Sequence, residues 1–391
     1  MGRKIQRSII KTINTLIFNK QTNELGTIIF TMLFKKLLFV STVLLVVSNI
    51  FIYQPPGPLI RSRNHLRVKP PLTLVILCHN KVHEFDNMLS SLFKVRGIFD
   101  VNILVSQSGI DQRVSDIADS YKLRTIQHID DGVKIENRLA RHFKWTFEQV
   151  FSIYSESEGV IVIEDDFLFS PDFLEYFELT IPLLKIDPTL FTISAWNDIG
   201  FKQNTNDLHG LRRTTFFPGL GWYLTRDMWE NNLKDIWPDS DWDWVIRKFI
   251  DKNKMEIIIP EISRDYHAAS TGTYMKKWLF DQYFKNINYN TNASFRWKGN
   301  SDIEHVMSSD HYRYKIIKML QDNSVEKVWI DDNNMLKSKS SAKKYGVWHE
   351  PERGAWNGIR IIWNGSGYTL LIDIVNYPEW KHYNRRPSVN L

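Results

Sequence analysis

The chain of 391 residues has only one cysteine, Cys78. A single cysteine excludes an internal disulfide framework and a zinc site built from paired cysteines. The sequence also lacks a Walker-type loop, and no G-x-G-x-x-G motif follows the first predicted strand. These absences argue against a P-loop enzyme and against a dinucleotide-dependent oxidoreductase. They leave the compartment open, because a large core needs no disulfides.

The chain has no strong excess of one charge over most of its length. It contains 50 Lys and Arg against 44 Asp and Glu, and much of the difference lies in the first seventy residues. A basic arm beside a membrane segment explains this distribution better than nucleic-acid binding does, so we expect no nucleic-acid partner. Hydrophobic residues make up 43% and charged residues 24%, which is typical of a globular protein.

Residues 37–53 form an apolar run without a charged side chain, at the short end of the roughly 17–25 residues that span a bilayer. Lys35 and Lys36 precede it, and no well-placed small residues suggest cleavage. We predict a transmembrane signal anchor that contacts membrane lipid; the alternative is a buried strand or helix of the core. Residues 1–36 would then be a cytoplasmic tail, and residues 54–71, rich in proline and basic residues, a short stem.

Strand-like and helix-like patterns alternate after the stem. Strands are predicted at 72–78, 101–107, 123–129 and 159–166, and helices at 85–93, 113–121 and 136–153. This alternation predicts an α/β fold with a mainly parallel sheet, in which ligands bind at the carboxyl ends of the strands. We assign residues 72–290 to a donor-binding and catalytic core. Residues 291–391 are predicted to form a smaller C-terminal region with a hairpin at 358–374.

The most informative segment is the strand that runs straight into Glu164, Asp165 and Asp166. Three adjacent carboxylates repel one another unless a cation or hydrogen-bond donors offset their charge. Mg²⁺ and Mn²⁺ prefer oxygen ligands and commonly combine one or two carboxylates with substrate phosphates. The segment therefore indicates a metal-assisted diphosphate site, with an exposed acidic turn as the simpler alternative.

Longer motifs make the chain resemble the eukaryotic N-acetylglucosaminyltransferase I family, which also contains the protein O-mannose N-acetylglucosaminyltransferase. The segments that carry the resemblance, in the family's order, are IEDDFLFSPDFLEYF (163–177), SAWNDIGF (194–201), FFPGLGWYL (216–224), WPDSDWDWVIR (237–247) and IIPEISRDYH (258–267). Five long motifs in order are far more specific than an acidic triplet alone. The resemblance covers residues 72–290 well and the remainder weakly.

The resemblance implies a GT-A type nucleotide-diphospho-sugar transferase fold, dependence on Mn²⁺ and an inverting mechanism. It implies transfer of N-acetylglucosamine (GlcNAc) from UDP-GlcNAc, in β-1,2 linkage, to a mannose of a glycan on a glycoprotein. Carried over by residue, the resemblance makes Asp166 the metal ligand and Asp243 the catalytic base. It places Glu164 and Asp165 beside the donor sugar and ribose, and it makes His142 a nucleotide contact. The sugar site would also contain Leu220, Trp242 and Gly272.

The base can also be argued from chemistry. Inversion in one displacement needs a base for the acceptor hydroxyl. A carboxylate between Trp242 and Trp244 would be partly desolvated, which raises its basicity. Asp241 is the competing candidate; Asp243 is preferred because it keeps the family's four-residue distance to Arg247. The alternative for both acids is a capping or first-turn role in a helix.

The chain departs from the family pattern at the nucleotide end. Asn80 and Ser108 stand where the enzyme acting on N-glycans has an arginine and an aspartate, and Tyr274 replaces a small polar residue. These changes leave a catalytically silent sugar-binding relative as an alternative. A glycoside hydrolase would need two carboxylates flanking the bond at roughly 5–10 Å and leaves the diphosphate-type motif unexplained.

The resemblance also implies a location and favours one acceptor. We expect a single-pass type II protein of the Golgi membrane with its catalytic part in the lumen, and the sequons at Asn292 and Asn364 fit that orientation. O-mannose enzymes carry a lectin-like domain before the catalytic one, for which residues 54–71 have no room. The N-glycan acceptor is therefore favoured over the O-mannose acceptor.

Overall fold

The computed structural model describes residues 71–130, 134–298, 303–331 and 344–384, which belong to one compact unit. The predicted tail, signal anchor and stem lie outside these ranges. Among the residues described, no helix combines the length and apolar character needed to cross a membrane.

The central sheet has five strands in the order β3-β2-β1-β4-β8. Its strands are β1 (Thr73–Cys78), β2 (Asn102–Ser108), β3 (Arg124–His128), β4 (Gly159–Glu164) and β8 (Trp222–Thr225). The pairs β3–β2, β2–β1 and β1–β4 are parallel, and β8 runs antiparallel to β4. The predicted α/β fold with a mainly parallel sheet is confirmed, and four predicted strands match β1 to β4 closely.

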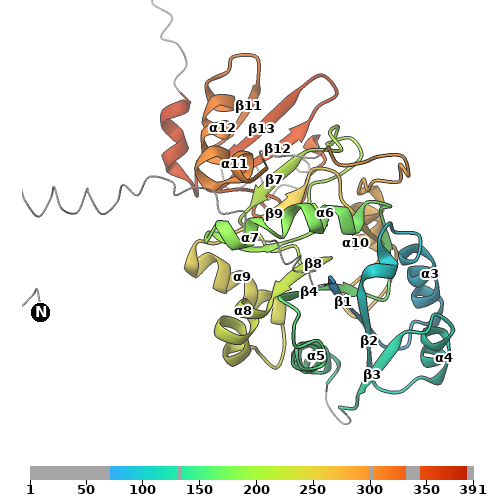
Figure 1. The fold of residues 1–391 in the computed structure, drawn as a ribbon. Helices are drawn as coiled ribbons and strands as arrows, with labels where there is room; N and C mark the ends of the chain where they lie inside the picture. The colour runs from blue at the N-terminus through green and yellow to red at the C-terminus, as the bar shows by residue number, and fades with distance from the viewer. Residues whose placement is uncertain (1–70, 131–133, 299–302, 332–343, 385–391) are drawn as a thin grey trace, which may run out of the picture. The chain divides into compact units, whose positions relative to one another are not determined.

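Helices cover both faces of this sheet, as the alternation of β1 requires. Leu74 and Ile76 share a buried cluster with residues of α3 (Val82–Leu92) and α4 (Gln112–Ser120). Val75 and Leu77 belong to another cluster, which contains apolar residues of α5 (Ile135–Ile153). Figure 1 shows α3 and α4 on one side of the sheet and α5 on the other. Because both faces are covered, ligands have access at the strand ends.

A second sheet, in the order β6-β9-β7, joins β6 (Leu190–Ile193), β9 (Glu256–Pro260) and β7 (Leu211–Thr214). Strand β7 buries two arginines, which carboxylates neutralise. The Arg212 Nη2 to Glu261 Oε2 distance is 2.9 Å, and Arg213 pairs with Asp187 and Glu256. Charged residues can occupy this strand only because every guanidinium has an acidic partner.

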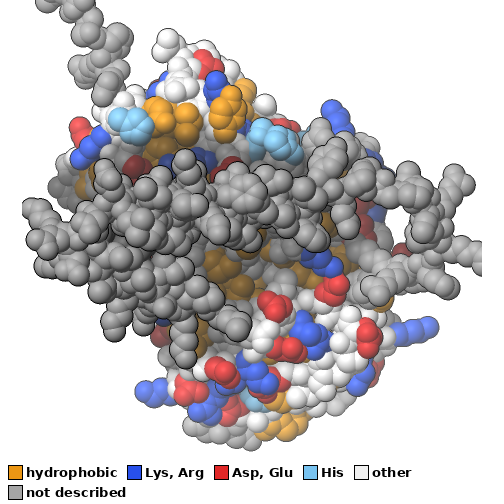
Figure 2. Space-filling view, turned by 60° about the vertical axis from the view of Figure 1, so that its left-hand side comes forward, with side chains coloured by type: hydrophobic (Ala, Val, Ile, Leu, Met, Phe, Trp, Pro, Cys, Tyr) orange, Lys and Arg blue, Asp and Glu red, His pale blue; other side chains and the backbone are white. Residues whose placement is uncertain are grey.

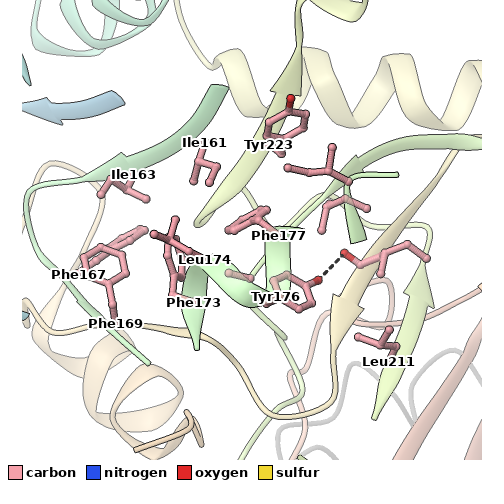
Figure 3. Close-up of a cluster of buried hydrophobic side chains, with 14 of the residues drawn as sticks. Ile161, Ile163, Phe167, Phe169, Phe173, Leu174, Tyr176, Phe177, Leu211 and Tyr223 are labelled. Carbon is pink, nitrogen blue, oxygen red and sulfur yellow. Dashed lines mark hydrogen bonds between the residues drawn. The ribbon is translucent and has the colours of Figure 1, made fainter. Parts of the chain in front are cut away.

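The two sheets are packed together by α6 (Phe173–Thr180), which is followed by α7 (Leu183–Ile186). Figure 3 shows Phe173, Leu174 and Phe177 across from Ile161 and Ile163 of β4. In the same cluster, the Tyr176 hydroxyl lies 2.8 Å from the Ser194 carbonyl and 3.4 Å from that of Ile258. This packing fixes the strand that carries the acidic triplet.

The C-terminal region is a three-stranded sheet in the order β11-β13-β12 with helices beside it. Its elements are α11 (Ile303–Met307), α12 (Ser309–Gln321), β11 (Glu326–Ile330), β12 (Ile359–Trp363) and β13 (Tyr368–Asp373). The hairpin predicted at 358–374 is confirmed by the antiparallel β12–β13 pair. Tyr312 and Ile316 of α12 share a buried cluster with Leu74 of β1, so this region and the core share apolar packing.

Further strands and helices lie between residues 167 and 282. They are β5 (Phe167–Phe169), α8 (Arg226–Met228), α9 (Trp242–Asn253), β10 (Asp265–His267) and α10 (Lys277–Gln282). On the described part of the face in Figure 2, acidic and basic side chains are mixed over the lower half. The charges there offset one another locally.

Candidate active site

All eight residues predicted for the site line one cavity of about 1240 Å³ among the described residues. The cavity lies at the carboxyl ends of β1, β2 and β4, where the fold predicts a ligand. It extends along α9 to the C-terminal region, which contributes Glu350, Glu352 and Arg353. The structure therefore brings the predicted residues together, and their individual roles remain predictions.

The acidic triplet lies at the end of β4 with its charges close together. Asp165 and Asp166 are 7% and 6% exposed. Burial, together with repulsion from the Asp166 and Asp165 carboxylates, raises the pKa of Glu164 to about 8. Burial and the Asp166 charge raise the pKa of Asp165 to about 7. The Asp165 carboxylate accepts a hydrogen bond from the His79 backbone N–H at 3.1 Å, so β1 helps to hold it.

Two basic side chains approach Asp166. The Lys81 Nζ lies 2.6 Å from Asp166 Oδ2, and the His267 Nε2 lies 3.5 Å from the same oxygen. Strand β10 brings His267 there by pairing with β5, which follows the triplet directly. Burial lowers the pKa of His267, against the attraction of Asp166.

The residues present fit a divalent ion that is shared with a ligand. Asp166 Oδ1 is buried and has no hydrogen-bond partner within the described part of the chain. Those same residues contain no group of three or more His, Cys, Asp or Glu side chains arranged to hold a metal. Asp166 would hold the ion, and most other ligands would come from a diphosphate and water, as is common for Mg²⁺ and for similar hard ions.

At the far end of the cavity, His142 of α5 is buried and held by hydrogen bonds. Its Nε2 lies 2.9 Å from the Ser106 hydroxyl, which also contacts the Thr146 hydroxyl at 2.7 Å. Burial lowers the pKa of His142 to about 3, so the ring is neutral. Asn80 and Ser108, the two departures from the family pattern, line the same cavity.

The Pro218–Trp222 loop contributes Pro218, Gly219 and Leu220 to the lining of the cavity. Its Leu220 carbonyl accepts a hydrogen bond from the Ser194 hydroxyl at 2.8 Å. Gly221 has φ +44°, and a Cβ at that position would lie 1.8 Å from the Asp265 Oδ2. Both oxygens of Asp265 are buried without a hydrogen-bond partner among the described residues, and burial raises the pKa of this carboxyl well above its usual value. The loop therefore requires glycine at this point.

Asp243 lies in the first turn of α9 and pairs with Arg247, whose Nη1 is 2.7 Å from its Oδ2. Trp242 is buried and stacks on Trp222, with ring centroids 6.2 Å apart. Trp244, the other tryptophan next to Asp243 in the sequence, is 59% exposed. The Arg247 guanidinium that pairs with Asp243 lies over the Trp244 ring, 5.5 Å from its centroid.

The competing acid, Asp241, has a different setting. It is exposed, precedes α9 with φ +50°, and its side chain makes no capping hydrogen bond to the helix. It also lines the cavity. The structure thus brings both candidate bases to the cavity, and only Asp243 has an arginine that orients it.

Sequence reasoning missed several cations of the cavity, among them Lys81 and Arg353. Lys81 follows β1 at the same edge of the sheet as the triplet. The rule that ligands bind at the carboxyl ends of parallel strands therefore also pointed to Lys81. Arg353 lies with its guanidinium over Trp348 and Phe216, and its Nη1 is 3.4 Å from Asp198 Oδ1. No local pattern predicts a contact between residues 155 positions apart.

Two buried charged residues near the cavity have partners elsewhere in the protein. Asp198 is buried beside Trp196 and does not line the cavity. The Arg264 Nε lies 2.6 Å from Asp172 Oδ2, and Glu261 is engaged by Arg212.

Comparison with solved structures gives distant similarities. The chain is 14% identical to a mannosyltransferase from Pyrobaculum calidifontis in complex with GDP-Man and Mn²⁺, with a TM-score of 0.34 over 50% of this chain and 59% of that one. It is 14% identical to S. aureus TarS 1-349 in complex with UDP, with a TM-score of 0.36 over 51% and 60% of the two chains.

Comparison with characterised sequences gives a nearer relative. The chain is 34% identical over 222 residues to an alpha-1,3-mannosyl-glycoprotein 2-beta-N-acetylglucosaminyltransferase of Arabidopsis thaliana. The match covers 54% of this chain and 49% of the relative, so the chain spans about half the length of that protein. The profile of the GNT-I family matches residues 58–347, which is most of the chain, and the protein therefore belongs to the GNT-I family.

Proposed function

We propose that the protein is an inverting glycosyltransferase that transfers GlcNAc from UDP-GlcNAc, in β-1,2 linkage, to a mannose of an N-glycan on a glycoprotein. The observation that carries this proposal is the single cavity in which the acidic strand end, the Pro218–Trp222 loop and Asp243 meet. Membership of the GNT-I family and the name of the Arabidopsis relative support this donor and acceptor. A GT-A type fold accords with the parallel sheet.

The transfer needs one base on the acceptor side. The Asp243 carboxylate takes the proton of the acceptor hydroxyl while that oxygen bonds to the anomeric carbon of the donor. The bond from this carbon to the diphosphate breaks, and UDP leaves with the electron pair. Arg247 orients Asp243 through the 2.7 Å contact. The exposed Trp244 beside it offers a flat apolar surface to the acceptor sugar.

The leaving diphosphate needs positive charge on the opposite side. A bound Mn²⁺ would supply it, with Asp166 as the protein ligand. Glu164 and Asp165 bind the hydroxyls of the donor sugar and ribose, Leu220, Trp242 and Gly272 border the sugar, and neutral His142 contacts the nucleotide. These assignments follow the family pattern, and all of these residues line the cavity.

The direct test is a transfer assay with the purified chain, UDP-GlcNAc and Mn²⁺, using a mannose-terminated N-glycan and an O-mannosyl peptide as competing acceptors. We expect β-1,2-linked GlcNAc on the N-glycan, with the linkage read by NMR. Transfer to the peptide alone would replace the acceptor in this proposal. Donor binding without turnover on either acceptor would support a catalytically silent sugar-binding protein.

We further propose that residues 37–53 anchor the protein in the Golgi membrane as a single-pass type II protein, with the catalytic part in the lumen. The apolar run and its flanking lysines support this location. Deleting residues 1–60 should give a soluble, active protein. If the deletion variant is insoluble and inactive while the full chain is active in detergent, residues 37–53 belong to the core.

A further inference from the structure

An ammonium group already occupies the side of the cavity where the metal is expected. The Lys81 Nζ lies 2.6 Å from Asp166 Oδ2 and 4.0 Å from Asp165 Oδ1. The two carboxylates are almost fully buried, whereas the Lys81 side chain is 30% exposed. The lysine therefore reaches from the open cavity to the carboxylates, which are held from behind by the sheet.

Lys81 also lies near the loop that contains Gly272. A Cβ at Gly272 would lie 3.4 Å from the Lys81 Nζ and 3.6 Å from the Met275 Cβ. The ammonium is thus located between the acidic pair and the loop that contains Gly272. A diphosphate bound in this part of the cavity would lie within reach of the same ammonium.

The anchoring of Lys81 suits a side chain that changes partners. Its carbonyl accepts a hydrogen bond from the Phe85 N–H at 2.9 Å at the start of α3, which fixes the backbone. The four-carbon side chain leaves the ammonium free to move over several ångströms, and a lysine binds phosphate as a point charge. A cation at Asp166 Oδ2 also repels a metal ion bound by the other oxygen, so the two cations compete for the same carboxylate.

We propose that Lys81 is a diphosphate-binding residue that pairs with Asp166 in the metal-free protein and transfers to the donor's phosphate oxygens when a divalent ion takes Asp166. This inference rests on the proposed function, because it assumes a nucleoside diphosphate donor. It makes two predictions of opposite sign for removal of the ammonium. Mn²⁺ alone should bind more tightly, because its competitor is gone, and UDP should bind less tightly.

The test uses the purified full chain in detergent and three variants, Lys81→Met, Lys81→Arg and Lys248→Met. Lys248 is a matched control because it lines the same cavity from α9 and is exposed. Mn²⁺ binding without nucleotide is measured by electron paramagnetic resonance of the free ion. UDP binding is measured by calorimetry, once with Mn²⁺ and once with EDTA.

For Lys81→Met we expect Mn²⁺ affinity to rise by about tenfold and UDP affinity at saturating Mn²⁺ to fall by about 10- to 100-fold, as for a lost charge-assisted hydrogen bond. Lys81→Arg should retain most of the UDP affinity, and Lys248→Met should match the wild type in both measurements. A lysine that only holds Asp166 in place would give unchanged or weaker Mn²⁺ binding in Lys81→Met, and that result overturns the proposal. So does unchanged UDP binding at saturating Mn²⁺.

Failure of the proposed function gives a different pattern. If the wild-type chain binds no UDP even with Mn²⁺, the donor assignment fails, and the diphosphate role of Lys81 fails with it. If the wild type binds UDP normally with Mn²⁺ and Lys81→Met behaves like Lys248→Met, only the inference about Lys81 fails.

Discussion

The cavity has two acidic walls that are built in opposite ways. At the end of β4, Asp165 and Asp166 are almost fully buried and lie beside a third carboxylate. At the start of α9, the Asp243 side chain is 34% exposed and is paired with Arg247. The first wall concentrates carboxylates whose mutual repulsion a cation can offset. The second presents one oriented carboxylate to a cavity that a hydroxyl can enter.

This difference arises from the elements that carry the acids. A buried strand holds successive residues rigidly, so carboxylates at its end cannot separate, and their repulsion persists. A helix places residues i and i+4 on one face, so Asp243 meets Arg247 within the same helix. A cation site and a proton acceptor need different surroundings, and a strand end and a helix start supply them.

The largest expected effect is on turnover and comes from changing Asp243 at the start of α9. Asp243→Asn keeps the shape of the side chain but removes the proton acceptor, so turnover should fall by at least about 10²-fold, within the range of about 10²–10⁴ typical of general bases. The dissociation constant for UDP-GlcNAc, measured by calorimetry, should change by no more than a few fold.

Asp241→Asn is the matched control, since it removes the same charge two residues away. If Asp243 is only a first-turn acid of the helix, its substitution should cost about 1 kcal/mol of stability and little turnover per folded molecule. A larger loss of turnover in Asp241→Asn would assign the base to Asp241.

At the end of β4, the main expected effect of a substitution is on donor binding. Because even outer-shell partners are worth about 10- to 100-fold in metal affinity, Asp166→Ala should weaken Mn²⁺-dependent UDP-GlcNAc binding by about 100-fold or more. Calorimetry measures the donor affinity, and circular dichroism verifies that the variant is folded. Unchanged donor affinity in a folded variant would remove Asp166 from the metal site.

Sequence patterns predicted these two walls unequally. The strand end was predictable because an apolar run followed by carboxylates fixes both burial and position. Asp243 and its pairing with Arg247 four residues on were also open to prediction, because a helix brings such residues together. The exposure of Trp244 was not, because it depends on how α9 packs. Strand β7 had no apolar signal, since it buries Arg212 and Arg213 against acids distant in sequence. Contacts between distant residues, such as Arg353 with Asp198, leave no local pattern.

The next largest effect is on stability and comes from the Pro218–Trp222 loop. Gly221→Ala would place a Cβ 1.8 Å from Asp265 Oδ2, so we expect a loss of about 3 kcal/mol in the free energy of unfolding from strain and overpacking. Gly219→Ala is the control for strain alone. Its φ is +76°, yet a Cβ there would meet no atom closer than 3.6 Å, so the loss should be about 1 kcal/mol.

Chemical denaturation measures both glycine variants, and adding Asp265→Ala to Gly221→Ala should restore part of the loss. Equal losses in the two single variants would show that the carboxyl of Asp265 does not restrict the loop.

The smallest expected effect is a change of stability with pH that arises from His142, on the sheet side of the cavity. The pKa of His142 is lowered to about 3 in the folded protein. Between pH 6.5 and 3, the unfolded chain therefore binds a proton at His142 that the folded chain does not bind. The stability conferred by neutral His142 is therefore complete above pH 6.5 and is lost as the pH falls towards 3. At pH 5 the loss amounts to about 2 kcal/mol. The raised pKa values of Asp165 and Glu164 act in the opposite direction, lowering stability as the pH rises towards 7 and 8.

The total pH profile therefore cannot isolate the histidine, but the difference between two proteins can. We compare the free energy of unfolding of His142→Asn with that of the wild type by urea unfolding. The amount by which the variant is less stable should be about 2 kcal/mol smaller at pH 5 than at pH 7. His382→Asn serves as the control, because it makes the same substitution at an exposed histidine. A constant difference for His142→Asn would mean that this ring takes up its proton without unfolding, and that the sheet side of the cavity is as open to water as the start of α9.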